Sequence, residues 1–160
     1  MRSKILELME RNNHLTPAEI AVMIGVSEEN VEAEIAAMEE DKTILGYHTL
    51  INWEKTDREL VTALIEVKVT PQRGLGFDKI AERIYQYPDV KSVYLMSGAF
   101  DLVVEMEGKT MKDVAFFVSQ KLAPMDSVLS TATHFVLKKY KQNGFVFEDH
   151  HKDEREAIWL

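Results

Sequence analysis

The sequence contains no cysteine in its 160 residues. Disulfide bridges, zinc sites built on thiolates and cysteine nucleophiles are therefore excluded. The sequence also lacks an apolar run of membrane-spanning length, and charged side chains interrupt residues 1–7 too soon for a signal peptide. Together these absences predict a soluble protein of the cytoplasm with no membrane partner.

Basic residues are scarce in the first third of the chain. The net charge is −8 overall, and residues 1–50 carry four Lys or Arg against ten Asp or Glu. Residues 28–41 contain seven acidic side chains and no basic one. Because cations that neutralise phosphates supply most non-specific affinity for nucleic acid, this part of the chain is a poor electrostatic partner for DNA.

Residues 1–50 also have the apolar spacing of three short helices. Thr16, Pro17 and Glu19 predict the start of the second helix, because they match a cap, the first helical position and a capping box. Gly25 ends that helix and Ser27 caps the third. The residues predicted to face inward are Ile5, Leu8 and Met9, then Ile20, Ala21 and Ile24, then Val31, Ile35 and Met38. This spacing is typical of a helix-turn-helix unit, and equally of a small helical bundle without a DNA role.

The chain changes character after the third helix. Residues 49–53 predict a short strand that acts as a wing and exit linker, and the polar residues 54–58 predict a domain boundary. From residue 59 the apolar period is two, as in a strand with one face in a core. The expected elements are then a strand from 59, a helix over 77–84, strands over 91–97 and 101–107, a helix over 111–122 and a strand from 128 to about 140.

This order of elements predicts an α+β fold with a ferredoxin-like βαββαβ unit. Both helices should cover one face of its antiparallel sheet and leave the other face open. The residues expected on the open face include Thr62, Leu64, Tyr94 and Met96. They are too apolar for plain solvent, which predicts a subunit partner. The predicted domain limits are 1–50 (winged helix-turn-helix), 51–58 (strand or linker), 59–145 (ferredoxin-like) and 146–160 (charged tail).

Residues 97–101 read Ser-Gly-Ala-Phe-Asp and join the two middle strands. Gly98 can adopt a positive φ and lets another molecule approach the backbone closely. Asp101 adds a carboxylate at the start of the next strand. Backbone N–H groups beside one fixed carboxylate suit a small zwitterion, whereas a plain hairpin with a turn aspartate has the same sequence pattern.

A three-helix winged unit, a strand linker and a βαββαβ domain with Ser-Gly-x-x-Asp between its middle strands resembles the Lrp/AsnC family. These proteins are leucine-responsive, or feast/famine, transcriptional regulators of bacteria and archaea. The resemblance extends over residues 2–141. The stretches that support it are Glu-Ile-Ala at 19–21, Gly-Val-Ser at 25–27, Ile-Leu-Gly-Tyr at 44–47, Pro-Asp-Val at 88–90, the loop at 97–101 and Ser-Thr-Ala-Thr at 130–133.

The resemblance implies a homodimer formed through the C-terminal sheets and assembled further into tetramers or octamers. It also implies a small amino-acid effector at the interface of neighbouring C-terminal domains, with no other cofactor. The residues carried over to that site are Ser97, Gly98, Ala99, Phe100, Asp101, Thr131 and Thr133. Asp101 would pair with the α-ammonium group, and N–H groups near Gly98 would receive the α-carboxylate.

The third helix departs from the family pattern. Glu34 stands where the family usually has an arginine, so the bidentate contact to guanine is absent. The Asn30 side chain could form hydrogen bonds with adenine, and a glutamate could accept a hydrogen bond from cytosine. The candidate DNA-binding residues are Thr16, Ser27, Asn30, Glu34, Lys42 and His48. The cations expected to compensate in part for the acidic helix are Arg2, Lys4, Arg11 and Lys42, with His14 and His48.

Two other classes of function stay open on the sequence alone. The same scaffold could act without DNA, as an effector-binding or protein-interaction module that docks its acidic helix onto a basic surface. Some relatives resemble sirohaem decarboxylases, which use histidine and arginine. The histidines outside the tail are scattered at 14, 48 and 134 and form no acid–base pair. We therefore predict no enzyme and no catalytic or metal site, and a solvated tail rather than a metal site at 150–151.

Overall fold

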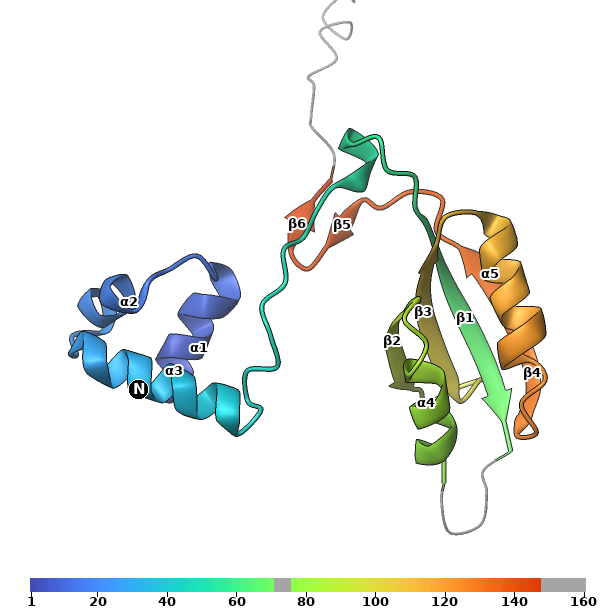
Figure 1. The fold of residues 1–160 in the computed structure, drawn as a ribbon, viewed down its shortest axis with the longest axis horizontal. Coiled ribbons are helices and arrows are strands. Elements are labelled where there is room, and N and C mark those ends of the chain that lie inside the picture. The colour runs from blue at the N-terminus through green and yellow to red at the C-terminus, as the bar shows by residue number, and fades with distance from the viewer. Residues whose placement is uncertain (71–75, 148–160) are drawn as a thin grey trace, which may run out of the picture. The chain divides into compact units, whose positions relative to one another are not determined.

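The computed structural model describes residues 1–70 and 76–147. The chain divides into two compact units, Met1–Ile51 and Asn52–Leu160 (Figure 1). Within the described ranges no helix is both long and apolar enough to cross a membrane.

The N-terminal unit contains the three predicted helices, α1 (Arg2–Arg11), α2 (Pro17–Ile24) and α3 (Glu28–Glu40). Its core residues, all buried, are Ile5, Ile20, Ala21, Val31 and Met38. The remaining residues predicted to face inward, Leu8, Met9, Ile24 and Ile35, are partly buried against that core. The helical spacing read from the sequence is therefore confirmed.

The predicted helix ends are also confirmed. The Thr16 hydroxyl accepts a hydrogen bond from the Glu19 N–H at 3.3 Å, and the Glu19 carboxylate accepts one from the Thr16 N–H at 2.8 Å. This reciprocal pair is a capping box. Gly25 ends α2 with a φ of 73°, a conformation in which glycine avoids the steric cost of a Cβ atom. The Ser27 hydroxyl accepts from the Asn30 N–H at 3.4 Å and starts α3.

The strand predicted at residues 49–53 is not formed. Residues 43–52 contain no strand, and Trp53–Lys55 form a short 3₁₀ helix, η1. A strand needs a hydrogen-bonded neighbour, and the ladders among the described residues involve only residues 61–146. The Asn52 side chain instead accepts a hydrogen bond from the Glu54 N–H at 3.2 Å, which favours the turn.

The C-terminal unit has the predicted ferredoxin-like order. Its four main strands are β1 (Val61–Val69), β2 (Val90–Leu95), β3 (Leu102–Gly108) and β4 (Val128–Phe135). They form one antiparallel sheet in the order β2-β3-β1-β4, with β1 and β3 in the middle. The helices are α4 (Asp78–Tyr85) and α5 (Met111–Phe117), and α5 continues as the π-helical turn η2 (Val118–Leu122).

Both helices pack on one face of the sheet and form its core. Alternate residues of β1 face this core, as predicted, and Ile65 and Val67 are fully buried. The other buried members are Ala63, Val69, Ile80, Ile84, Leu102, Val104, Met106, Val114, Phe117, Leu122 and Met125. Tyr87 packs against this core and makes an edge-to-face contact with Phe117, with ring centroids 5.2 Å apart.

The inward face predicted for the second helix is partly wrong. Met111 and Ala115 are exposed, whereas Phe117 is buried with Val114 and Leu122. Met111 and Ala115 precede the π turn, and the inward face of α5 itself is formed by Val114 and Phe117, which are three residues apart. An unbroken α-helical period therefore does not describe this element.

The last strand is shorter than predicted. Its final hydrogen bond to the sheet runs from the Val136 N–H to the Thr62 carbonyl at 2.9 Å. Strand β1 begins at Val61, so no partner backbone extends beyond this point. The chain instead forms a hairpin from β5 (Lys141–Gln142) and β6 (Phe145–Val146).

The open face of the sheet is more polar than the sequence pattern suggested. Leu64 and Tyr94 are 40% and 55% exposed on it, as expected for an apolar surface. Strand pairing adds three glutamates to the same face, at positions 66, 105 and 107. His134 lies 3.3 Å from the Glu66 carboxylate across the β1–β4 pair. The face therefore combines apolar side chains with polar and acidic ones.

We expect Ile65→Ala to lower the free energy of unfolding of the C-terminal unit by ~2–5 kcal/mol, because it leaves a cavity in the core. The matched control is Lys68→Ala, an exposed position on the same strand, whose effect should stay within about 0.5 kcal/mol. Urea unfolding followed by circular dichroism measures both. Equal effects would contradict the assignment of the core face.

Candidate functional site

The loop between β2 and β3 is built around a glycine conformation. It comprises residues 96–101, and the Met96 N–H donates to the Asp101 carbonyl at 2.8 Å to close it. Gly98 has a φ of 144°, which other residues rarely adopt. A Cβ atom at this position would meet no other atom within 4 Å. The backbone at Gly98 is thus open to an approaching molecule.

Asp101 has a structural role that the sequence analysis missed. Its N–H donates to the Val67 carbonyl at 3.1 Å, and its carboxylate accepts the Val69 N–H at 2.9 Å. Val69 is the point where the β1–β4 register shifts. The carboxylate of the half-buried Asp101 therefore accepts a hydrogen bond from a backbone N–H at a strand end where the regular pairing is interrupted.

The two threonines lie on the other side of β1 from this loop. On β4, Thr131 and Thr133 are opposite Val67 and Ile65, and both are half-buried on the helix-covered face. Leu102, which follows the loop, is opposite Val67 on the other flank. Two strand spacings separate the flanks, which is about 10 Å. Within one chain, the loop and the threonines therefore lie on opposite flanks of β1.

The candidate DNA-binding residues have mixed roles. The side chains of Thr16 and Ser27 serve as helix caps. Asn30, Lys42 and His48 are exposed, and Lys42 adopts a φ of 64° just after α3. The Lys42 ammonium group is thus available at the end of this helix.

Glu34 forms a salt bridge with an arginine of another helix. Its carboxylate lies 2.5 Å from the Arg2 guanidinium, which also contacts the Asp41 carboxylate at 2.7 Å. Arg2 is therefore engaged by α3, and it is not a free cation that compensates for the acidic helix. Sequence reasoning missed this arrangement because Arg2 precedes its two partners by 32 and 39 residues.

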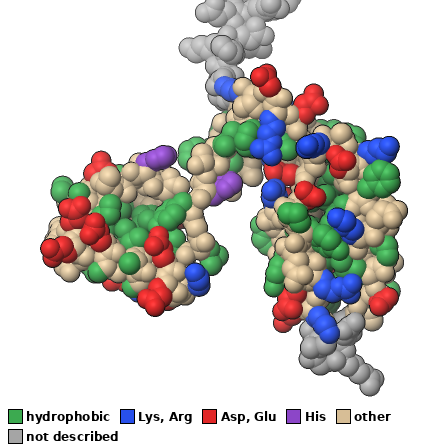
Figure 2. Space-filling view, in the orientation of Figure 1, with side chains coloured by type: hydrophobic (Ala, Val, Ile, Leu, Met, Phe, Trp, Pro, Cys, Tyr) green, Lys and Arg blue, Asp and Glu red, His purple; other side chains and the backbone are tan. Residues whose placement is uncertain are grey.

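The outward face of α3 remains acidic at its edges. Glu29, Ala33, Ala36 and Glu40 are exposed and recur at the spacing of one helix face. A further glutamate, Glu39, accepts a hydrogen bond from the Tyr47 hydroxyl at 2.7 Å. In Figure 2, acidic side chains are prominent on the three-helix unit. Two small alanines thus stand between glutamates where a recognition helix would meet DNA.

The end of α3 holds a carboxylate with a perturbed pKa. Hydrogen bonds from Thr43, and then from Arg2, lower the pKa of Asp41 from its ordinary 3.8 to about 2. The Thr43 N–H donates to this carboxylate at 2.9 Å. The pKa of the Glu19 carboxyl group is also lowered, because this group accepts a hydrogen bond from the Thr16 N–H.

We expect the N-terminal unit to lose stability as the pH falls from about 4 to about 2. A carboxyl group with a lower pKa in the folded state stabilises the fold above its unfolded pKa, and that contribution disappears as the group protonates. Asp41→Asn should reduce the slope of melting temperature against pH in this window. Thermal melts of the full chain between pH 2 and pH 7 test this, with Asp57→Asn as the control. An unchanged slope would contradict the assignment.

A three-helix unit followed by a ferredoxin-like unit defines a helix-turn-helix protein with a ligand-binding domain, and known proteins share both units. The Lrp/AsnC ligand binding domain family matches residues 62–146. The uncharacterized HTH-type transcriptional regulator YugG of Bacillus subtilis is 51% identical over 157 residues, which cover 98% of this chain and 95% of YugG. The chain therefore belongs to the Lrp/AsnC family of transcriptional regulators.

Solved structures agree on the fold. The complex of a Neisseria meningitidis transcriptional regulator with L-Met has a TM-score of 0.70 at 23% identity, and covers 88% of this chain and 90% of that one. A feast or famine regulatory protein of M. tuberculosis, complexed with L-methionine, has a TM-score of 0.69 at 18% identity, with coverage of 88% and 92%.

Proposed function

We propose that this protein is a cytoplasmic DNA-binding regulator whose C-terminal unit binds a small amino acid and associates with other copies. The observation that carries the proposal is the loop at residues 96–101, which contains both an open Gly98 backbone and the Asp101 carboxylate. This loop belongs to the part of the chain that matches a ligand-binding domain family. We retain the domain limits 1–50 and 59–145 for the two activities.

The ligand chemistry follows from these two groups. Amide N–H groups around Gly98 suit a carboxylate, and Asp101 supplies a fixed negative charge for an ammonium group. One Asp101 oxygen accepts the Val69 N–H, and a carboxylate has acceptor capacity beyond that bond. The two related structures that contain methionine support an amino acid as the ligand class.

A second copy of the chain would complete the site. The backbones of the loop and of the threonine strand lie on opposite flanks of β1, about 10 Å apart, so a neighbouring copy is proposed to supply the remaining contacts. Association through the open sheet face would cover Leu64 and Tyr94, which are substantially exposed in the single chain. We therefore propose a homodimer through this face, assembled further into tetramers or octamers, with the effector between C-terminal units.

Substitution of Asp101 separates its structural role from ligand binding. Asp101→Asn keeps an oxygen for the Val69 N–H but removes the charge, so stability should hold while amino-acid affinity falls at least tenfold. Asp101→Ala leaves that N–H without its partner and should also cost ~1–3 kcal/mol of unfolding free energy. Calorimetric titration with L-methionine, paired with urea unfolding, measures both effects. If the Asp101→Asn variant binds L-methionine as tightly as wild type does, the proposed contact between Asp101 and the ammonium group is rejected.

DNA binding is proposed to depend on few phosphate contacts repeated across an oligomer. The exposed alanines of α3 suit apolar contact with thymine methyl groups, but the flanking glutamates repel phosphates. Lys42 is the exposed cation that directly follows this helix. Linked binding units raise overall affinity without any new contact, so assembly compensates for a weak single unit.

Lys42→Gly tests this contact without unfolding the unit. Lysine at a φ of 64° is strained, and glycine relieves that strain. The variant should melt at or above the wild-type temperature and still bind promoter DNA more weakly. The slope of log affinity against log salt should become shallower by about 0.9 per subunit that contacts phosphate. Gel-shift titrations from low to moderate salt, with Lys109→Gly as the control, measure it. An unchanged slope would exclude Lys42 as a phosphate contact.

A further inference from the structure

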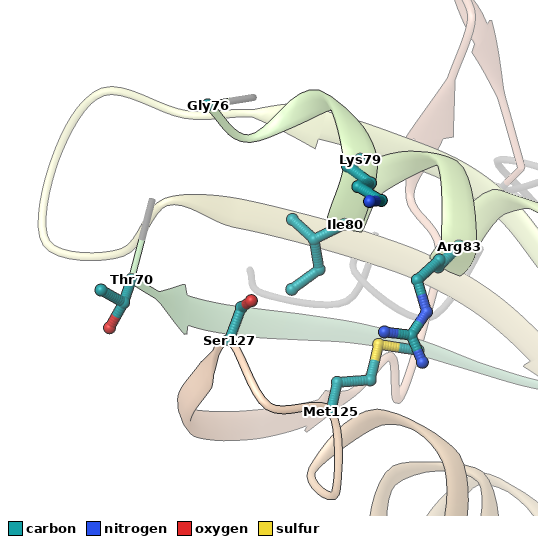
Figure 3. Close-up of a pocket in the computed structure, with 7 residues that line it drawn as sticks. All are labelled: Thr70, Gly76, Lys79, Ile80, Arg83, Met125 and Ser127. Carbon is teal, nitrogen blue, oxygen red and sulfur yellow. The ribbon is translucent and has the colours of Figure 1, made fainter. Parts of the chain in front are cut away.

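A small pocket opens at one end of the C-terminal sheet, between α4 and the strand ends. Its volume is about 130 Å³. The described residues that line it are Thr70, Gly76, Lys79, Ile80, Arg83, Met125 and Ser127. In Figure 3, Ile80 points from α4 toward Ser127, and Arg83 extends from the next turn toward Met125. The sequence analysis did not find this site, because its residues come from three separate segments.

The rim of this pocket carries two cations and no described carboxylate. Lys79 and Arg83 are one helical turn apart on α4 and both are exposed. Among the described residues, neither forms a salt bridge or hydrogen bond. The acidic residues of the same helix, Asp78 and Glu82, do not line the pocket. Two unpaired like charges on one helix face repel each other, and an anion between them would relieve that repulsion.

The lining is mixed, because Thr70 and Ser127 add polar groups to the apolar side chains of Ile80 and Met125. Ile80 is 8% exposed and Met125 is 6% exposed. A ligand with an anionic head for the rim and a short hydrocarbon part beside Ile80 and Met125 suits this lining. A cavity of ~150 Å³ holds a molecule the size of benzene, so about five heavy atoms fit inside this slightly smaller pocket, with a charged group left at its rim. Inorganic phosphate has the charge but no apolar part.

We propose that this pocket binds a small carboxylate without an ammonium group, such as a short 2-oxo acid. The carboxylate lies between Lys79 and Arg83, and the alkyl part packs on Ile80 and Met125. An amino acid of the same length fits poorly, because its ammonium group would approach two cations and find no described carboxylate in the lining. The pocket thus selects against the group that Asp101 is proposed to bind.

The pocket and the loop share one strand end. The Val69 N–H binds the Asp101 carboxylate, and the next residue, Thr70, donates its N–H to the Ser127 carbonyl at 2.9 Å. The pocket assignment rests on its own lining residues, so it stands whether or not the loop binds an amino acid.

Calorimetric titration of the full chain with sodium 2-oxobutyrate tests the proposal. Arg83→Gln and Lys79→Gln should each weaken binding about ten- to a hundredfold, since each removes a charge-assisted contact. Arg83→Lys, which keeps the charge, should recover part of the affinity. Lys112→Gln, a control cation on α5, should bind as wild type does. Melting temperatures of all four variants show whether each is folded.

Two further probes define the ligand class. L-2-aminobutyrate, which replaces the oxo group with an ammonium group, should not compete with 2-oxobutyrate, and Arg83→Gln should not alter any binding it shows. Phosphate should compete only weakly. The proposal is overturned if wild type does not bind 2-oxobutyrate, if folded Arg83→Gln binds it equally, or if either competitor displaces it at equal concentration. Failure of L-methionine to bind would reject the amino-acid site and leave this result unaffected.

Discussion

The pairing of β1 with a strand on each side is the constraint on which the C-terminal unit depends. Its odd-numbered residues fill the core, and its even-numbered residues help to form the open face. Because β3 and β4 are held in register by the same strand, the loop before Leu102 and the threonines of β4 are fixed on opposite flanks. The separation of the candidate effector residues is thus a direct consequence of sheet order.

Features set by local chemistry could be predicted from the sequence. The capping box at Thr16 and Glu19, the glycine at the end of α2 and the alternation along β1 each depend on residues a few positions apart. Features set by distant partners could not. The sequence around residues 49–53 does not show that this segment lacks a partner strand. The sequence of α5 likewise does not predict the π turn that follows it. In the candidate site, the positive φ of Gly98 could be predicted from the sequence, but the hydrogen bond from Val69 to Asp101 joins residues 32 positions apart.

In the N-terminal unit, one arginine neutralises part of the acidic charge of α3. Counted along the sequence, α3 and its C-terminal cap carry seven acids and no base. In the folded unit, Arg2 of α1 pairs with Glu34 and Asp41, so two of these acids stabilise contacts between helices. The acidity that still opposes DNA is therefore confined to the exposed positions, such as Glu29 and Glu40. Charge totals alone overstate the repulsion.

The end of β1 brings two opposite electrostatic environments close together. On one flank a carboxylate is held by the Val69 N–H, and beyond Thr70 the pocket rim carries two cations. An amino acid and the matching oxo acid share a carboxylate and a side chain and differ mainly at the ammonium group. The two proposed sites carry opposite charge, so each favours the molecule whose differing group the other disfavours.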